Sequence, residues 1–341
     1  MLSILGPFRI NCWWEHKLSP ILATIYATAV LSGIPFPSLW PVVALALPAL
    51  IVCASYVSVL NDLTDVKDDQ ASGKPGRWPG GARIYPVLLL AGCMVAGSAF
   101  LIIWRKDILL FSIYLLSWLA FTLYSAPPLR LKVRGIWGVL ADASGAHLFS
   151  TLFAVVLVYH WNRTKTPTQW IILIVLWSFA AGVRGILWHQ LEDAVHDRKI
   201  GLRTFACLHG TKVAERLGLL AFLLESAAFS LMLWLTHNAL AWLFLVMYLL
   251  FALVRWRLLG ISLTVIQPGQ ASRMAMAEYY IVIYPLAYLL AASWQQPSAL
   301  SLLLLHSVLF PRHGLYLVRE IVAMMRMGKP GDGPKPAAFH S

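Results

Sequence analysis

Charged residues are scarce in this sequence of 341 residues: Asp, Glu, Lys and Arg together make up 12%, while hydrophobic residues make up 59%. Soluble globular domains carry about 25% charged residues, so the composition excludes an ordinary soluble protein. The mean hydropathy of +0.71 is typical instead of a chain that crosses a membrane several times.

Cysteine is also scarce, and its four residues, Cys12, Cys53, Cys93 and Cys207, are scattered along the chain. None of them has the CxxC spacing of a redox or zinc motif, so we expect reduced thiols that pack in the interior. Residues 1–17 carry scattered charges and no small-residue cleavage site. We therefore expect no cleavable signal peptide, and interpret residues 1–16 as an interfacial lead-in.

Long apolar runs dominate what is present. Each is near the roughly 20 residues that span a bilayer core, and they lie at about 18–34, 41–60, 84–104, 107–125, 136–159, 169–190, 213–235, 239–259 and 277–294. We therefore predict an all-α, polytopic bundle of about nine transmembrane helices over residues 17–295. Residues 296–327 form an apolar or amphipathic segment, and residues 328–341, rich in Pro and Gly, are expected to be a disordered tail.

The net charge of +12 has an uneven distribution. Most Lys and Arg residues lie at the N-terminus and in the loops after the second, fourth, sixth and eighth runs, whereas the opposite loops hold only Arg105, Lys106, Arg163 and Lys165. The positive-inside rule then predicts an integral membrane protein whose N-terminus faces the cytoplasm. No separate basic domain or motif indicates a nucleic-acid partner. Residues 298–310 are apolar but short, and fit a tenth span, a re-entrant piece or an interfacial helix.

Acidic residues number only 15, yet several cluster at the end of the second apolar run. In a helix, Asp62, Asp65 and Asp69 would share one face, and such stacked carboxylates call for a hard divalent cation such as Mg²⁺. Asn61 adds an amide oxygen. Gly and Pro then break the helix beside Lys74 and Arg77, which suit the phosphate oxygens of a metal-bound ligand. The alternative is a solvated loop whose charges pair with one another.

The same spacing returns 128 residues later, at the end of the sixth apolar run. His189, Gln190, Asp193 and Asp197 repeat the positions of Asn61, Asp62, Asp65 and Asp69, with Gly201 at the position of Gly73. We therefore predict a second metal site in which Asp193 and Asp197 bind the ion and Gln190 supplies a neutral oxygen. Three basic residues near this cluster are candidate diphosphate ligands: Arg198, Lys199 and Arg203.

A basic stretch follows the fourth apolar run, Tyr124-Ser-Ala-Pro-Pro-Leu-Arg130-Leu-Lys132-Val-Arg134-Gly. The two prolines end the helix. Arg130 and Lys132 are candidate pyrophosphate ligands, and Tyr124 could donate a hydrogen bond to a leaving phosphate or place its ring beside a cation. The alternative is a positive-inside anchor.

These three motifs resemble the UbiA superfamily of membrane prenyltransferases, whose pattern is NDxxDxxxD after the second helix and a related DxxxD cluster after the sixth. Asn61-Asp62-x-x-Asp65-x-x-x-Asp69 and Asp193-x-x-x-Asp197 match it, and the Tyr124 to Gly135 stretch is also similar. The resemblance covers roughly residues 17–295. It implies a central cavity in the bundle, Mg²⁺ bridging the aspartates to an isoprenyl diphosphate, and transfer of the prenyl group to an acceptor.

Two departures from the family pattern concern the acceptor. His189-Gln190 stands where many relatives have Asn-Asp, and the Arg-Thr-x-x-Arg-Pro continuation of the 4-hydroxybenzoate and haem O branches is absent after Asp69. Gly73-Lys74 is closer to the chlorophyll, homogentisate or ether-lipid branches. The acceptor is therefore left open among phenolic, glycerophosphate and other compounds.

Ionisable residues within apolar runs are rare and merit attention as acceptor or cavity residues. Asp142 and His147 could orient or deprotonate the acceptor, while Arg184 could form an interhelical ion pair with Asp142. His189 could be a base, a metal ligand or a polar cap that hydrogen-bonds Asp193. Tyr56 and Trp188 could line the cavity, although packing alone is the more common role of such aromatics.

The leading hypothesis is an Mg²⁺-dependent prenyltransferase in which Asp62, Asp65, Asp69, Asp193, Asp197, Lys132 and Tyr124 act in catalysis. Metal and basic groups would stabilise the departing diphosphate. One alternative is a membrane terpene cyclase of the same superfamily, which needs the diphosphate alone. Another is a lipid-binding or transport scaffold without chemistry, whose function would survive loss of Asp65 or Asp193.

Overall fold

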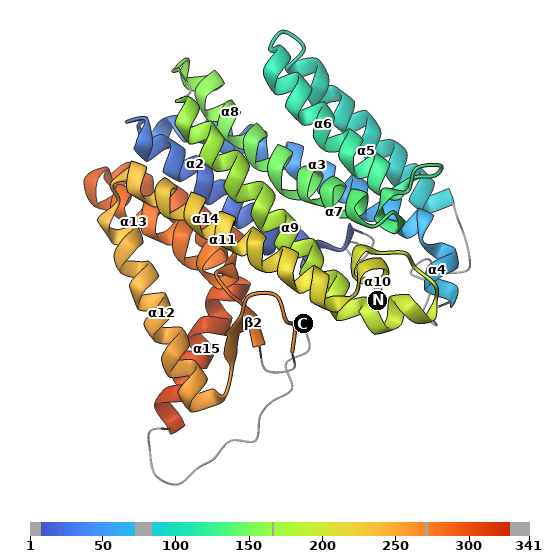
Figure 1. Ribbon diagram of the computed structural model, residues 1–341. Helices are drawn as coiled ribbons and strands as arrows, with labels where there is room; N and C mark the ends of the chain where they lie inside the picture. Colours follow the sequence, from blue (N-terminus) through green and yellow to red (C-terminus); the bar gives the residue numbers. More distant parts are fainter. Residues whose placement is uncertain (1–7, 72–83, 166, 270–271, 328–341) are drawn as a thin grey trace.

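The computed structural model describes residues 8–71, 84–165, 167–269 and 272–327, and it is almost wholly helical (Figure 1). The N-terminal half contains α1 Ile10–Trp13, η2 Trp14–Leu18, α2 Ser19–Leu31, η3 Phe36–Leu39, α3 Trp40–Thr64, α4 Val66–Ala71, α5 Ile84–Ile103, α6 Ile108–Ser125, η5 Leu131–Val133, α7 Ile136–Asp142, η6 Ala143–Phe149 and α8 Ser150–Asn162. The C-terminal half contains α9 Thr168–Lys199, α10 Phe205–His209, α11 Thr211–Thr236, α12 Ala239–Leu259, β1 Ser262–Thr264, β2 Ser272–Met274, η7 Tyr279–Ile283, α13 Tyr284–Gln295, η8 Pro297–Ala299, α14 Leu300–Leu309 and α15 Pro311–Met327. The predicted all-α bundle is confirmed, and the single exception within these ranges is the short parallel pair of β1 and β2.

Seven helices in the described part of the chain are long and apolar enough to cross a membrane. They are 36–64, 84–103, 108–125, 136–162, 168–199, 211–236 and 239–259. The sequence predicted nine spans, and the two that fail this test, near 18–34 and 277–294, are represented by the shorter α2 and α13. The two helices have only 13 and 12 residues, fewer than the roughly 20 that cross a bilayer core, and most of their Ser, Thr and Tyr side chains are buried inside the bundle.

Helix α2 lies at the centre of the bundle, where it packs against α8 and α13. Its buried residues run without a gap from Ile21 to Ala29. By contrast, α5 and α12 are apolar but mostly exposed, with 11% and 22% of their apolar windows buried. A helix that is apolar on all sides and exposed is suited to contact with lipid, so α5 and α12 form the periphery.

Helix α9 connects the interior with the candidate site, and it packs closely on the π-helical turn η6. A Cβ atom on Gly182 would lie 2.8 Å from the Cα of Ala143, so only glycine permits this approach of the two backbones. The close crossing fixes the position of α9, whose C-terminal end carries the second acidic motif.

The C-terminal segment bends sharply. Helices α14 and α15 are long and apolar enough to cross a membrane only when they are taken together, and they are bent by 79° at Phe310. Residues 298–310 therefore do not form a straight tenth span. Helix α15 lies beside α12 (Figure 1).

Candidate functional site

The first acidic motif lies at a break between two helices. Helix α3 ends at Thr64, Asp65 caps it, and α4 begins at Val66. The continuous helical face predicted for the three aspartates is therefore interrupted at Asp65, although the Asp69 amide still donates to the Asp65 carbonyl oxygen at 2.8 Å. The Asp62 side chain is buried, and its carboxylate accepts a hydrogen bond from Arg9.

The predicted basic stretch folds over this break. Arg130 donates to Asp65 at 2.9 Å and to Asp68 at 2.5 Å, and the Lys132 ammonium group contacts Asp65. Arg130 has a φ of 40°, a left-handed backbone conformation that non-glycine residues rarely adopt and that recurs at ligand sites. These contacts bring the basic stretch and the first acidic motif side by side, and the role of the basic residues as diphosphate ligands stays a prediction.

The two basic side chains respond differently to this environment. Burial lowers the pKa of Lys132, and the carboxylate of Asp65 only partly opposes the shift. Burial also disfavours the charge of Arg130, but its hydrogen bonds to Asp68 and Asp65 outweigh that effect and raise the pKa of the guanidinium. Arg130 is thus a permanent cation, while Lys132 is a partly desolvated one that gains from an added anion.

The second acidic motif occupies the last turns of α9. Asp197 is buried and accepts a hydrogen bond from Thr204 at 3.4 Å, whereas Asp193 is exposed to the cavity. A backbone bridge between Gly135 and Thr204 joins the basic stretch to the loop after α9. Gly135 has a φ of +59°, which suits glycine. This bridge holds the Lys132 loop beside both acidic motifs.

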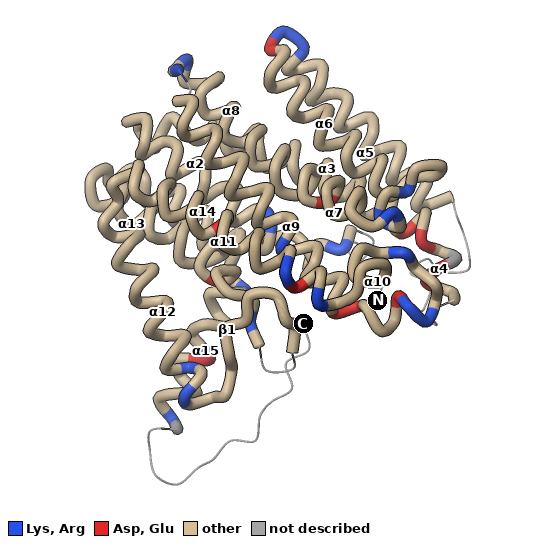
Figure 2. The backbone as a smooth tube through the Cα atoms, viewed as in Figure 1, with Lys and Arg blue, Asp and Glu red and all other residues tan. Residues whose placement is uncertain are grey.

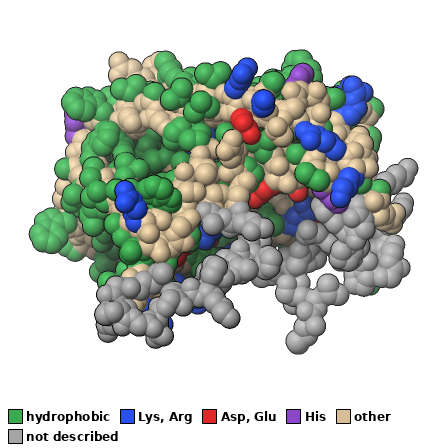
Figure 3. Space-filling model, turned by 60° about the horizontal axis from the view of Figure 1, so that its bottom comes forward, with side chains coloured by type: hydrophobic (Ala, Val, Ile, Leu, Met, Phe, Trp, Pro, Cys, Tyr) green, Lys and Arg blue, Asp and Glu red, His purple; other side chains and the backbone are tan. Residues whose placement is uncertain are grey.

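Both motifs open into one cavity of about 260 Å³. Its lining comprises Arg9, Asn61, Asp65, Asp68, Asp69, Tyr124, Lys132, Val133, Ile186, His189, Gln190, Asp193, His196, Asp197, Ile200, Leu202 and Thr204. Figure 2 shows the charged segments gathered at this end of the bundle, and Figure 3 shows acidic, basic and histidine side chains exposed together on the face turned forward there. The two motifs, 128 residues apart in the sequence, therefore form a single site.

The side chains present fit a magnesium ion shared with a substrate. Mg²⁺ prefers oxygen ligands, and it usually takes one or two carboxylates and completes its shell with phosphate oxygens and water. Residues 8–71, 84–165, 167–269 and 272–327 contain no group of three acid, His or Cys side chains that would enclose a metal by themselves. The oxygen of Gln190, predicted as a neutral ligand, accepts a hydrogen bond from the Ala206 amide at 3.2 Å. Its role as a ligand stays a prediction.

Several predicted site residues lie elsewhere. Arg198, Lys199 and Arg203 are exposed and do not line the cavity, because the helix end and the following loop direct Ile200, Leu202 and Thr204 inward instead. Lys74 and Arg77 lie outside the described residues. Two aromatic candidates pack in the bundle. Tyr56 shares a hydrogen bond of 2.8 Å with the Thr122 hydroxyl and stacks near Trp118, and Trp188 is buried in a second apolar cluster.

Two polar residues of α9 have partners that differ from those predicted. Arg184 forms a two-pronged ion pair with Glu225 on α11, at 2.6 and 2.7 Å, rather than with Asp142. His189 is paired with Glu192 at 3.5 Å rather than with Asp193. Glu225 reaches Arg184 across the contact between α9 and α11, and Glu192 lies three residues after His189 on α9.

A pair of ionisable residues lies deeper than the acidic motifs. The Lys17 ammonium group contacts Nε2 of His147, and Asp142 lies within electrostatic range of Lys17 and of Tyr124. Lys17 belongs to the π-helical turn η2 and His147 to the π-helical turn η6. Such turns are rare and often mark functional sites. Of these residues, the sequence had indicated Asp142, His147 and Tyr124, but not Lys17.

Sequence reasoning also missed Arg9, Asp68 and His196 as cavity residues. Asp68 and His196 stand inside the two motif segments, one residue from a predicted ligand, so their position alone was a signal. Arg9 had no such signal, because it immediately precedes the first helix and reaches Asp62 only through the fold.

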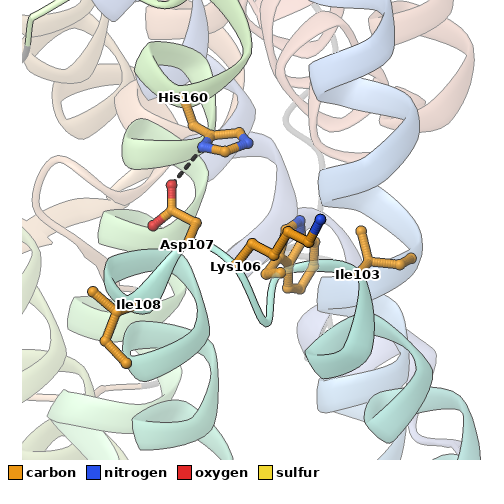
Figure 4. Close-up of a pocket in the computed structure, with 6 residues that line it drawn as sticks. Ile103, Lys106, Asp107, Ile108 and His160 are labelled. Atoms are coloured by element: carbon orange, nitrogen blue, oxygen red, sulfur yellow. Dashed lines mark hydrogen bonds and ion pairs between the residues drawn. The ribbon is translucent and has the colours of Figure 1, made fainter.

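A larger cavity of about 400 Å³ lies at the opposite end of α6, beside His160 (Figure 4). Its one acidic side chain, Asp107, accepts hydrogen bonds from the amides of Leu109 and Leu110 at the start of α6 and lies 2.5 Å from His160. Asp107 therefore serves as a helix cap. Aspartates of both acidic motifs and Lys132 line the smaller cavity instead.

Comparisons with known proteins identify the fold and the family. No curated protein matches the sequence significantly. Among solved structures, a UbiA homolog from Archaeoglobus fulgidus bound to GPP and Mg²⁺ has 15% identity and a TM-score of 0.55, covering 85% of this chain and 96% of that one. The same homolog bound to DMAPP and Mg²⁺ has 16% identity and a TM-score of 0.55, covering 85% and 98%. At this identity they establish a shared fold. Residues 21–261 match the UbiA prenyltransferase family, and the chain is an integral membrane protein that belongs to this family.

Proposed function

We propose that the protein transfers a prenyl group from an isoprenyl diphosphate to an acceptor in an Mg²⁺-dependent reaction. The observation that carries this proposal is the convergence of both acidic motifs and Lys132 on one cavity, beside which Arg130 pairs with two of the lining carboxylates. Carboxylates beside basic groups suit a metal-bound polyphosphate, because the carboxylates bind the metal ion and the basic groups bind the phosphate oxygens. The A. fulgidus homolog, which shares the fold, binds GPP or DMAPP with Mg²⁺.

In this proposal the aspartates hold the metal ions. Asn61, Asp62, Asp65 and Asp69 serve one ion, and Gln190, Asp193 and Asp197 serve the other. Lys132 and Arg130 bind the diphosphate oxygens, and Lys74 and Arg77 join them from the segment after α4. Tyr124 lines the cavity, and its hydroxyl donates a hydrogen bond to the diphosphate in this proposal. Arg198, Lys199 and Arg203 are left out of the set because their side chains point to solvent.

The reaction breaks the bond between C1 of the prenyl chain and the diphosphate oxygen. The electron pair leaves with the diphosphate, and bound Mg²⁺ supplies the electrostatic stabilisation of that leaving group. Lys132 is suited to the same task, because a cation in a partly desolvated position gains most from a charge that develops next to it. The acceptor then forms its bond to C1 and releases a proton.

The acceptor side of the site is proposed to lie deeper, near Lys17, Asp142 and His147. The acceptor's proton passes to the His147 Nε2 lone pair, on which Lys17 now lies, so Lys17 has to turn away from it or be neutral when the proton arrives. His189, at the cavity edge, lies between this pair and the second acidic motif. The acceptor is expected to be a phenolic, glycerophosphate or related compound.

The orientation follows from charge. The loops on the side of the acidic motifs hold most of the Lys and Arg residues (Figure 2). By the positive-inside rule this side, with the N-terminus, faces the cytoplasm, so the diphosphate enters from the cytoplasm and the prenyl chain extends toward the bilayer.

The experiment is product analysis. Purified protein is incubated in detergent with Mg²⁺ and geranyl, farnesyl or geranylgeranyl diphosphate, with and without phenolic and glycerophosphate acceptors, and the products are identified by mass spectrometry. Acceptor-dependent adducts that EDTA abolishes are expected. A hydrocarbon or terpene alcohol formed without acceptor would instead identify a cyclase. The absence of any product with all three diphosphates would favour a lipid-binding or transport scaffold that has no catalytic activity.

A further inference from the structure

Arg9 forms an ion pair with Asp62, which binds a metal ion in the proposed function. Its guanidinium donates to the Asp62 carboxylate, which is 2% exposed, and its side chain lines the cavity. Arg9 adopts a φ of 49°, in the left-handed region that favours glycine. Such strained residues persist only where the surroundings hold them, and they are common at ligand clamps.

The segment that carries Arg9 is held firmly at its other end. The Trp14 indole donates to the Leu309 carbonyl oxygen at 2.6 Å. The Glu15 carboxylate accepts from the amides of Arg312 and His313 at 2.7 and 2.8 Å, so it caps the N-terminus of α15. Residues 9–15 thus form a strap, anchored on the C-terminal helices and ending at the acidic motif.

A guanidinium and a magnesium ion compete for the same carboxylate. An ion that takes the Asp62 Oδ1 atom, to which Arg9 donates, displaces Arg9 from it, and the displaced guanidinium then lies within the cavity that receives the diphosphate. Arginine binds phosphate oxygens with two parallel hydrogen bonds. The displaced side chain therefore gains a suitable new partner when a metal-bound diphosphate occupies the cavity.

We propose that Arg9 is a diphosphate-binding residue that neutralises Asp62 in the empty site and exchanges Asp62 for the diphosphate when Mg²⁺ and substrate bind together. This inference rests on the proposed function and adds to it a residue outside the family motifs. It predicts opposite effects of one substitution. Arg9→Gln removes the cation that competes with a metal ion for Asp62, but it also removes a ligand of the diphosphate.

The test uses the full-length protein in detergent and two binding measurements that need no acceptor. Binding of Mn²⁺ alone, followed by electron paramagnetic resonance, is expected to become at least about threefold tighter in Arg9→Gln. Binding of farnesyl thiolodiphosphate in the presence of Mg²⁺ is expected to become at least about tenfold weaker. Arg9→Lys, which keeps the charge but loses the paired donors, should fall between wild type and Arg9→Gln in both measurements.

Two controls accompany these variants. Arg163→Gln changes a basic residue at the opposite end of the bundle and should alter neither measurement. Glu15→Gln loosens the anchor of the strap and should weaken analogue binding by a smaller factor than Arg9→Gln. A thermal melt confirms that each variant is folded.

The outcomes separate the two proposals. If wild-type protein binds the analogue with Mg²⁺ but Arg9→Gln binds both probes as wild type does, the role of Arg9 is wrong. The role is equally wrong if both probes weaken together, because Arg9 then merely supports the fold of the motif. If wild-type protein does not bind the analogue at all, the proposed function fails.

Discussion

Lys132 and Arg134 are neighbours in one loop, but their side chains have different surroundings. Lys132 contacts Asp65 at the cavity, while Arg134 is exposed and donates to the Pro128 carbonyl oxygen at 3.0 Å. The two positive charges of this loop thus differ: Lys132 faces the proposed diphosphate, and Arg134 faces solvent. The sequence alone does not show which of the two residues faces the cavity.

Lys132→Met is expected to weaken binding of a prenyl diphosphate by about 2–5 kcal/mol, the usual cost of removing one partner of a buried charge pair. The measurement is a titration of the analogue in the presence of Mg²⁺. Arg134→Met is the matched control and should change affinity by less than about 0.5 kcal/mol. Equal losses in the two variants would show that the loop acts only through its total charge.

Arg184 and Glu225 form a buried ion pair between α9 and α11, with side chains 2% and 0% exposed. Glu225→Leu leaves the guanidinium buried without its carboxylate, and is expected to lower the free energy of unfolding by about 3–5 kcal/mol. The double variant Arg184→Met/Glu225→Leu should recover most of that loss, because apolar side chains pack well in the same space. Thermal unfolding of both variants in one detergent decides this, and a double variant that is less stable than Glu225→Leu contradicts it.

At the scale of elements, the approach of α9 to η6 sets the position of the second acidic motif. Gly182 meets the backbone of Ala143. A Cβ atom on Gly185, one turn along the same helix, would have only a side-chain atom of His147 near it, at 3.8 Å. The two glycines therefore have different roles, and only the first is required by packing.

Gly182→Ala is expected to destabilise the protein by about 1–3 kcal/mol, since a methyl group would overlap a neighbouring backbone. It should also weaken diphosphate binding, because Asp193 and Asp197 move with α9. Gly185→Ala is the control and should leave both unchanged or slightly raise the stability through its better helix propensity. Thermal melts and analogue titrations of the two variants are compared. Similar changes in stability and binding at both positions would mean that they result from helix propensity and not from the contact of Gly182 with Ala143.

At the scale of the whole molecule, the sequence predicted the helical architecture, most of the spans and the position of the acidic motifs at the ends of two of them. Apolar runs and the repeated spacing of Asp65 and Asp193 are local signals, so they can be recognised without the fold. The partner of Arg184 could not be predicted, because Asp142 and Glu225 are both carboxylates within apolar runs and only helix packing distinguishes them. Arg9 and Lys17 reach the site from the N-terminal segment through contacts that no local pattern encodes.

In the proposed function, the two acidic motifs act as one Mg²⁺-dependent site for an allylic diphosphate. Their separation of 128 residues in the sequence and their shared cavity make this a property of the whole bundle. If they share one ligand, removing either motif should impair the binding of the same molecule. Removing both should then cost less than the sum of the two single losses, because groups that act together are not additive.

The most direct measurement is a double-mutant cycle with Asp65→Asn and Asp193→Asn, using farnesyl thiolodiphosphate titrated with and without Mg²⁺. We predict that wild-type binding requires Mg²⁺, that each substitution weakens it at least about tenfold, and that the coupling free energy is about 1–3 kcal/mol. Binding that persists in EDTA, or that either substitution leaves unchanged, would contradict a shared metal-dependent site.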